Sequence, residues 1–255
     1  MSRITQAYVA DSIKFFKKDF LKMYGLSEYH DPNQPALFFG GRESSVLLAK
    51  HKSWKLILPS HPTDYPIIND YARTIFICSD NYKLPPGVIR KSLTPRIKDY
   101  SIFKPNPLGD KIYMYSGYRE GWDIAMPSRG IVEELQKKID FEIITTDHIT
   151  MSDYYSIEDL KANFYDKSFL NLNFTPGRGL ASVIELGLMG RKTVFCPRLV
   201  NNIQRVEFKD NFIHFQTWED LLSIINSESK KIGTTQPSID AHNIDDEWLD
   251  LDFWL

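Results

Sequence analysis

The stretch that decides the fold is Phe169-Leu-Asn-Leu-Asn-Phe174, followed by Thr175-Pro-Gly-Arg-Gly179 and by Leu180-Ala-Ser-Val-Ile-Glu-Leu-Gly-Leu-Met189. Apolar and polar residues alternate in its first part, which predicts a buried β-strand. Proline and glycine then break the strand. In the last part the apolar side chains fall largely on one helical face, and Gly190 ends the predicted helix before a second strand at Thr193-Val-Phe195. The stretch therefore predicts half of a Rossmann-like unit.

The glycine loop and the helix that it opens form a candidate anion site. Backbone N–H groups at the start of a helix lie at the positive end of its dipole, which suits a phosphate or diphosphate. Arg178 adds a full charge there. Glu185, inside the helix, would be costly to bury alone but is suited to a hydrogen bond with a ligand hydroxyl. A short Gly-x-Gly loop is also common in ordinary βαβ units, where the glycines only make turns and a helix glutamate is solvated.

Glu185-Leu-Gly-Leu-Met-Gly190, followed by Lys192-Thr-Val194, resembles the C-terminal-domain motif of GT-B glycosyltransferases, close to the group 1 pattern. The resemblance implies that Glu185 binds the donor ribose and that the preceding loop holds the diphosphate. The loop residues concerned are Thr175, Gly177, Arg178 and Gly179. In the retaining branch of the family a second glutamate lies eight positions before the first, and here that position is Gly177. The looser pattern of a glycine loop and a helix glutamate is shared by inverting GT-B families, so both stereochemical outcomes stay open.

The residues before this stretch predict the rest of a second α/β domain. A predicted strand at Lys111–Tyr115 leads to Gly117 and Arg119, where GT-B enzymes commonly place a glycine and a basic residue that meet the donor phosphates. A turn glycine beside a surface arginine is the alternative. Another strand, Phe141–Thr145, leads to the segment that the resemblance assigns to the nucleotide base, Asp147, His148 and Ile149. Helices are predicted at Ser128–Lys138 and, capped by Ser156, at Ile157–Tyr165.

The first part of the chain predicts a parallel sheet of its own. After an amphipathic helix expected at Ile4–Tyr24, strands are predicted at Ala36–Phe39, Trp54–Leu58 and Thr74–Cys78. Ligands bind at the carboxyl ends of parallel strands. Four residues follow these ends: Gly40 and Gly41, expected on the acceptor side, and His61 and Asp80, the candidate catalytic acid or base groups. A surface histidine is the plainer interpretation of His61.

These elements predict an α/β fold with two Rossmann-like domains facing each other across a cleft, the GT-B arrangement, with a compact N-terminal domain. Residues 84–107 are proline-rich and resemble the segment that links the two domains of that family. The expected divisions are an acceptor-side domain at 1–105, a donor domain at 106–226 and a tail at 227–255. Trp248, Phe253 and Trp254 predict that the tail docks back on the domains, with a partner-binding motif as the alternative.

Composition excludes several classes of protein. With 255 residues, 42% of them hydrophobic, the chain can bury one large or two modest cores. A net charge of −2 gives no general basic field for nonspecific nucleic-acid binding. The two cysteines, Cys78 and Cys196, end different predicted strands and favour a reducing, cytoplasmic setting. No apolar run approaches a membrane span, and the Walker, dinucleotide, serine-hydrolase and zinc patterns are missing from the sequence.

The leading hypothesis is a GT-B glycosyltransferase that moves a sugar from a nucleotide-diphosphate sugar to an acceptor. The resemblance implies no metal and no cofactor besides this co-substrate. The acceptor stays open among a glycan, a lipid, a small molecule, a protein side chain and a modified nucleic-acid base. Two alternatives are a sugar-nucleotide epimerase of the same fold and a noncatalytic module that binds a nucleotide sugar or a partner.

Overall fold

The computed structural model describes residues 2–11, 14, 17–40, 47, 51, 53–58, 74–77, 86, 89–91, 99–115, 128–146, 156–173, 180–195, 212–238 and 252–253. The chain divides into two compact units. Unit 1 comprises Met1–Asp99 and Ile244–Leu255, and unit 2 comprises Tyr100–Asn243. Each unit is an α/β structure with a parallel sheet, which confirms the predicted class.

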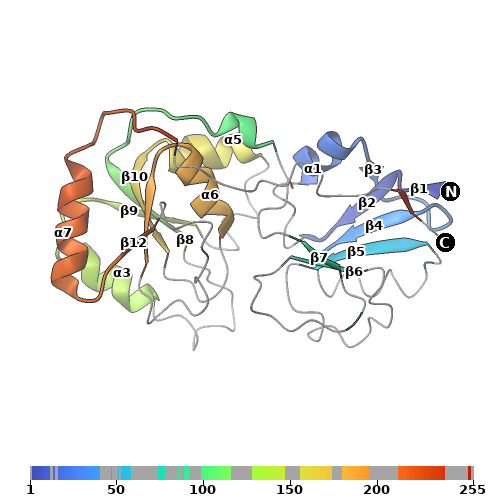
Figure 1. The fold of residues 1–255 in the computed structure, drawn as a ribbon, viewed down its shortest axis with the longest axis horizontal. Coiled ribbons are helices and arrows are strands. Elements are labelled where there is room, and N and C mark those ends of the chain that lie inside the picture. Colours follow the sequence, from blue (N-terminus) through green and yellow to red (C-terminus); the bar gives the residue numbers. More distant parts are fainter. Residues whose placement is uncertain are drawn as a thin grey trace. The chain divides into compact units, whose positions relative to one another are not determined.

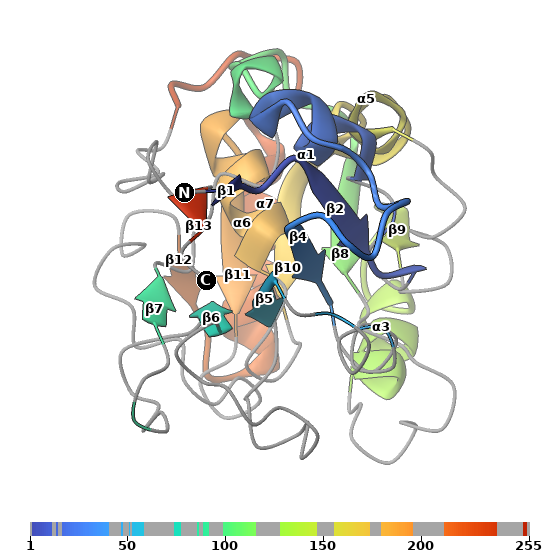
Figure 2. The same cartoon turned by 90° about the vertical axis from the view of Figure 1, so that its right-hand side faces the viewer.

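Unit 1 is built on a six-stranded parallel sheet with the order β3-β2-β4-β5-β6-β7. The strands are β2 (Gln6–Val9), β3 (Ser27–Glu28), β4 (Ala36–Phe39), β5 (Trp54–Leu58), β6 (Thr74–Ile77) and β7 (Ile89–Lys91). Helix α1 (Lys17–Tyr24) buries Phe20, whose ring meets that of Phe39 at 5.4 Å between centroids. Strands β2, β4, β5, β6 and β7 lie in this order in Figure 2.

The prediction of a helix at Ile4–Tyr24 was wrong for its first part, where the structure has strand β2. Gln6 is fully buried there, and its Oε1 accepts the backbone N–H groups of His30 at 2.9 Å and Asp31 at 3.0 Å. A strand inside a parallel sheet is covered on both faces, so its sequence lacks the polar–apolar alternation that would mark it. Among the described residues of this segment, the α-helix comprises Lys17–Tyr24.

Several short strands, β1 (Ser2–Arg3), β3, β7 and β13 (Asp252–Phe253), lie in segments for which the sequence predicted no regular structure. β7 falls within the proline-rich residues 84–107 and forms the last strand of the unit 1 sheet. Near the chain end, β13 pairs antiparallel with β1, and the two lie together in Figure 2. The chain thus leaves unit 1 after Asp99 and returns to it after Asn243.

Unit 2 holds a five-stranded parallel sheet with the order β12-β11-β10-β8-β9. The strands are β8 (Lys111–Tyr115), β9 (Ile143–Thr146), β10 (Ser168–Asn173), β11 (Lys192–Phe195) and β12 (Phe212–His214). In chain order the neighbours run second, first, third, fourth and fifth, so the winding direction reverses between β8 and β10. In open parallel sheets, ligands bind at such a reversal, beside the carboxyl ends of the strands.

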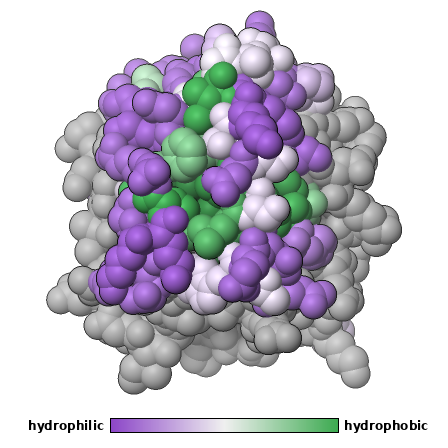
Figure 3. All heavy atoms as spheres, turned by 90° about the vertical axis from the view of Figure 1, so that its left-hand side faces the viewer, coloured by the Kyte–Doolittle hydropathy of each residue, from purple (hydrophilic) through white to green (hydrophobic). Residues whose placement is uncertain are grey.

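Helices cover both faces of the unit 2 sheet (Figure 1). Helices α3 (Ser128–Gln136) and α7 (Trp218–Ser229) bury Leu135, Leu221 and Ile225 against apolar strand residues. The short α5 (Ile157–Leu160) and α6 (Leu180–Leu188) lie on the other side. On the face drawn in Figure 3, many of the described residues are hydrophilic, and apolar ones gather near the centre. α7 continues past the expected start of the tail at 227, and residues up to 243 belong to unit 2.

The predicted ends of two helices are confirmed at atomic detail. Ser156 caps α5, its hydroxyl oxygen accepting the N–H of Asp159 at 3.1 Å. Gly190 follows α6 with a φ of 85°, a left-handed conformation that favours glycine. After α5 the chain widens into a π-helical turn, Lys161–Tyr165, where the sequence predicted a continuous helix.

Candidate active site

The candidate site lies at the carboxyl edge of the unit 2 sheet, where three neighbouring strands end. β8 ends at Tyr115, β9 at Thr146 and β10 at Asn173, and the pairings β8–β9 and β8–β10 are both parallel. The winding reversal between β8 and β10 therefore falls in the middle of this edge. Tyr113 of β8 and Asn171 of β10 are register partners across this reversal.

The segments that the sequence assigns to the donor follow these three strands directly. Gly117 and Arg119 come after β8, Asp147, His148 and Ile149 after β9, and Thr175, Gly177, Arg178 and Gly179 after β10. All nine residues lie outside the described part of the chain. Their attachment points are nevertheless fixed, because the chain enters each segment from one of three adjacent strand ends.

Glu185 is the predicted donor residue that the structure describes. It lies in the middle of α6, fully buried, and its Oε2 accepts a hydrogen bond of 2.6 Å from the hydroxyl of Tyr165. This hydrogen bond offsets part of the cost of burying the polar carboxyl group. The solvated helix glutamate of an ordinary βαβ unit does not describe this side chain. A ligand hydroxyl would reach it only after the groups that cover it move.

A second tyrosine extends this cluster toward the end of β9. The Tyr113 hydroxyl lies 2.6 Å from Thr146 Oγ1, and the Tyr113 ring packs edge-on against Tyr165 at 5.1 Å. Burial is the main cause that raises the pKa of both phenols far above their usual value. Both hydroxyls therefore stay protonated at any physiological pH. The Tyr165 hydroxyl donates to Glu185, and in the pair of Tyr113 and Thr146 either hydroxyl can be the donor.

Sequence reasoning missed that polar side chains are buried along β10. Asn171 and Asn173 look like the solvent-facing half of an alternating strand, yet they are 0% and 3% exposed. Asn171 donates to Thr193 Oγ1 at 2.9 Å, while its own Oδ1 has no hydrogen-bond partner among the described residues. With Tyr113, Thr146, Tyr165 and Glu185, these side chains form a buried polar layer in unit 2. The signal available in the sequence was the asparagine pair itself, since a parallel sheet is covered on both faces.

In unit 1 the predicted acceptor-side and catalytic residues follow neighbouring strands as well. Gly40 ends β4 with a φ of 122°, which favours glycine, and its N–H donates to the Ile57 carbonyl at 3.1 Å. The winding reversal of this sheet falls between β2 and β4, so Gly40 stands at it. Gly41, His61 and Asp80 follow β4, β5 and β6 in the chain and lie outside the described residues.

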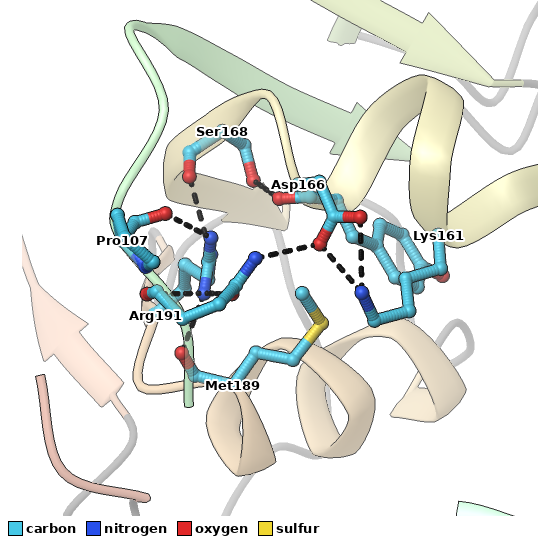
Figure 4. A network of polar contacts seen from close by, with 8 residues as sticks. Pro107, Lys161, Asp166, Ser168, Met189 and Arg191 are labelled. Carbon is cyan, nitrogen blue, oxygen red and sulfur yellow. Dashed lines mark hydrogen bonds and ion pairs between the residues drawn. The ribbon is translucent and has the colours of Figure 1, made fainter. Parts of the chain in front are cut away.

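A buried arginine that the sequence did not single out marks the opposite, amino-terminal edge of the unit 2 sheet (Figure 4). Arg191 is fully buried, and its guanidinium donates to the carbonyls of Ser168 at 3.2 Å and Pro107 at 3.0 Å. It also donates to Met189 and to Asn106, which in turn donates to Asp166. Burial lowers the pKa of Arg191 to about 10, which leaves the group charged at neutral pH. This network holds the amino ends of β10 and β11 together and is structural.

No protein-family model matches the chain, and none of the curated proteins compared with it matches significantly. Among the described residues, no helix combines the length and the apolar character needed to cross a membrane. In the same part of the chain, no three His, Cys, Asp or Glu side chains are grouped so that they could hold a metal ion.

Proposed function

We propose that this chain is a GT-B-type glycosyltransferase that uses a nucleotide-diphosphate sugar, with the donor bound by unit 2 and the acceptor by unit 1. One observation carries the proposal. The three segments with donor-binding patterns follow three adjacent strands at one sheet edge, and the winding reversal falls between two of them. The three segments are therefore neighbours at the place where parallel sheets bind ligands.

The proposed chemistry is electrostatic. The acceptor oxygen attacks the anomeric carbon of the donor sugar, and the bond between that carbon and the diphosphate oxygen breaks. Arg119, Arg178 and the loop amides would stabilise the negative charge that develops on the leaving diphosphate. The acceptor proton would pass to a base in unit 1, for which His61 and Asp80 are the candidates.

Glu185 takes part in this proposal as the group that binds a ribose hydroxyl. The helix that carries it, α6, begins directly after the loop residue Gly179. Its burial and its hydrogen bond to Tyr165 support a carboxylate held in a fixed position beneath the ligand. A freely moving surface acid would not serve that purpose.

The test is incubation of the purified chain with UDP-, GDP-, ADP- and dTDP-sugars. We expect slow hydrolysis of one donor, with release of its nucleoside diphosphate, because water replaces a missing acceptor in transferases. Inversion at C2 of the sugar without hydrolysis would establish an epimerase instead. Binding without turnover of any donor would identify a noncatalytic module, and an absence of all binding would overturn the proposal.

A further inference from the structure

The buried pair Glu185 and Tyr165 carries an inference that rests on the proposed function and deepens it. Both side chains are buried, and they come from different elements, the middle of α6 and the end of the π-helical turn. The phenol has one hydrogen to donate, and it donates that hydrogen to Glu185 Oε2 at 2.6 Å. Tyr165 therefore sets where one oxygen of the carboxylate lies.

Tyr165 is itself held in place from several directions. Its ring contacts Tyr113 at 5.1 Å and Phe103 at 6.2 Å between centroids. Its backbone carbonyl accepts the hydroxyl of Ser168 at 2.9 Å, which ties it to the first residue of β10. Close packing of this kind leaves the phenol one orientation.

The π-helical turn explains how the tyrosine comes to face α6. A π-helical turn is wider than an α-helical one, so the residues after it point in a different direction from those of a continuous helix. The turn spans Lys161–Tyr165, and Tyr165 is its last residue. Such turns are rare and recur at functional sites, and this one stands directly before the strand that leads to the candidate phosphate loop.

From these contacts we infer that Tyr165 is a positioning residue for donor recognition: its hydroxyl holds the Glu185 carboxylate in the orientation that binds a ribose hydroxyl. It does not touch the donor. Without this hydrogen bond, Oε2 of Glu185 would lose the partner that orients it, and the contact with the ribose would weaken while the contacts with base and diphosphate remained. The role thus affects one part of the ligand selectively.

The experiment compares a nucleoside diphosphate with its 2′-deoxy and 3′-deoxy analogues by calorimetry, using the nucleotide that the wild-type chain binds best. The wild type should prefer the ribonucleotide over at least one analogue. Tyr165→Phe, which keeps the ring, should bind the ribonucleotide roughly five- to tenfold more weakly, the effect of one hydrogen bond. Its affinity for the discriminated analogue should stay within about twofold.

Two further variants isolate the pair. Glu185→Gln should remove the same discrimination, and the double variant should lose no more than either single one, because the two residues act as a unit. Thr193→Val is the matched control, since it removes the buried hydroxyl that Asn171 donates to at 2.9 Å in the same sheet. It should bind all three nucleotides as the wild type does. Urea unfolding of each variant measures the loss of stability separately.

Tyr165→Phe overturns the inference if it weakens all nucleotides equally, changes none of them, or binds the ribonucleotide more tightly. If that variant does not fold, Glu185→Asp withdraws the carboxylate from the Tyr165 hydroxyl without altering the tyrosine, and retained discrimination in it overturns the inference. A wild type that binds nucleotides without discriminating the ribose removes the role of Glu185 and this inference together. A wild type that binds no nucleotide overturns the proposed function itself.

Discussion

A single glycine ends α6 and brings the chain into β11, and its replacement tests how tightly this junction is built. Gly190 has a φ of 85°, and a Cβ added to it would lie 2.6 Å from the Gln236 carbonyl oxygen. We expect Gly190→Ala to lower the free energy of unfolding by roughly 1 to 3 kcal/mol, the cost of a strained backbone residue. Gly130 in α3 is the control, since its added Cβ would meet nothing within 4 Å. Gly130→Ala should be neutral or stabilising by up to about 1 kcal/mol in the same urea titration.

At the residue scale the sequence predicted backbone roles better than side-chain environments. The helix end at Gly190 and the cap at Ser156 follow from local chemistry and are confirmed. The burial of Glu185 and its hydrogen bond to Tyr165 depend on a contact across 20 residues of chain, which no local pattern encodes. The same is true of Arg191, whose bond to Asn106 spans 85 residues. Buried polar partners are set by tertiary packing.

The buried side chain of His51 in unit 1 predicts that the stability of the protein depends on pH. His51 is 8% exposed, with Nε2 at 2.6 Å from the Tyr29 hydroxyl and its ring against Phe38 on β4. Burial lowers the pKa of His51 below 6.5, although the charge of Asp31 acts in the opposite direction. The unfolded chain therefore takes up this proton first, and stability present above pH 6.5 is lost as the pH falls below it.

Urea unfolding at pH 7.5 and pH 5.5, about one unit to either side of the usual histidine pKa, measures this effect. The single proton contributes at most about 1.4 kcal/mol for each pH unit below the unfolded pKa. His51→Phe keeps an aromatic ring beside Phe38 and cannot titrate, so its loss of stability over this range should be smaller than that of the wild type. Equal losses in the two proteins would show that His51 protonates as readily in the folded state.

At the scale of elements, strands delimited by turn residues were predicted closely, whereas β2 was not. β8 and β5 have the predicted bounds, and β10 differs by one residue at each end, because turn residues delimit all three. β2 was mistaken for helix, since a strand covered on both faces shows no alternation of polar and apolar residues. The order of strands could not be predicted from the sequence, because it is set by which edges pair in space. Parallel pairing places the three proposed donor segments at one edge, and the strand order makes them neighbours there.

The proposed roles of Arg119 and Arg178, in the segments after β8 and β10, predict that both arginines contribute to the binding of a nucleoside diphosphate through its phosphate charge. Arg119→Ala and Arg178→Ala should each weaken the binding of a nucleoside diphosphate by roughly 1.5 to 3 kcal/mol, the range for hydrogen bonds to a charged group. Binding of the corresponding nucleoside should not change, because it carries no phosphate. Calorimetry with the diphosphate and the nucleoside checks both statements. Equal weakening of the two ligands would place these arginines outside the phosphate site.

In the proposed mechanism, arginine side chains and backbone amides of the protein, and no metal ion, stabilise the negative charge on the leaving nucleoside diphosphate. If the arginines and loop amides supply that charge, donor hydrolysis should continue at about its original rate in EDTA. The rate of nucleoside diphosphate release before and after chelation is the measurement. Complete loss of hydrolysis, restored by Mn²⁺ or Mg²⁺, would show that a metal carries this role.

The proposed donor site and the proposed catalytic base belong to different units of the chain. The proposed donor segments follow strands of unit 2, whereas His61 follows β5 of unit 1, and each unit has its own parallel sheet. His61→Ala should therefore lower turnover at least about 100-fold, the lower end for general acid/base catalysis, and leave nucleotide affinity within about twofold. Asp80→Asn is the companion variant, because Asp80 follows the neighbouring strand β6. Turnover that survives in His61→Ala and falls in Asp80→Asn would transfer the role to Asp80. Nucleotide binding that falls in step with turnover in His61→Ala would mean that unit 1 holds the donor, and the assignment of the two units would be reversed.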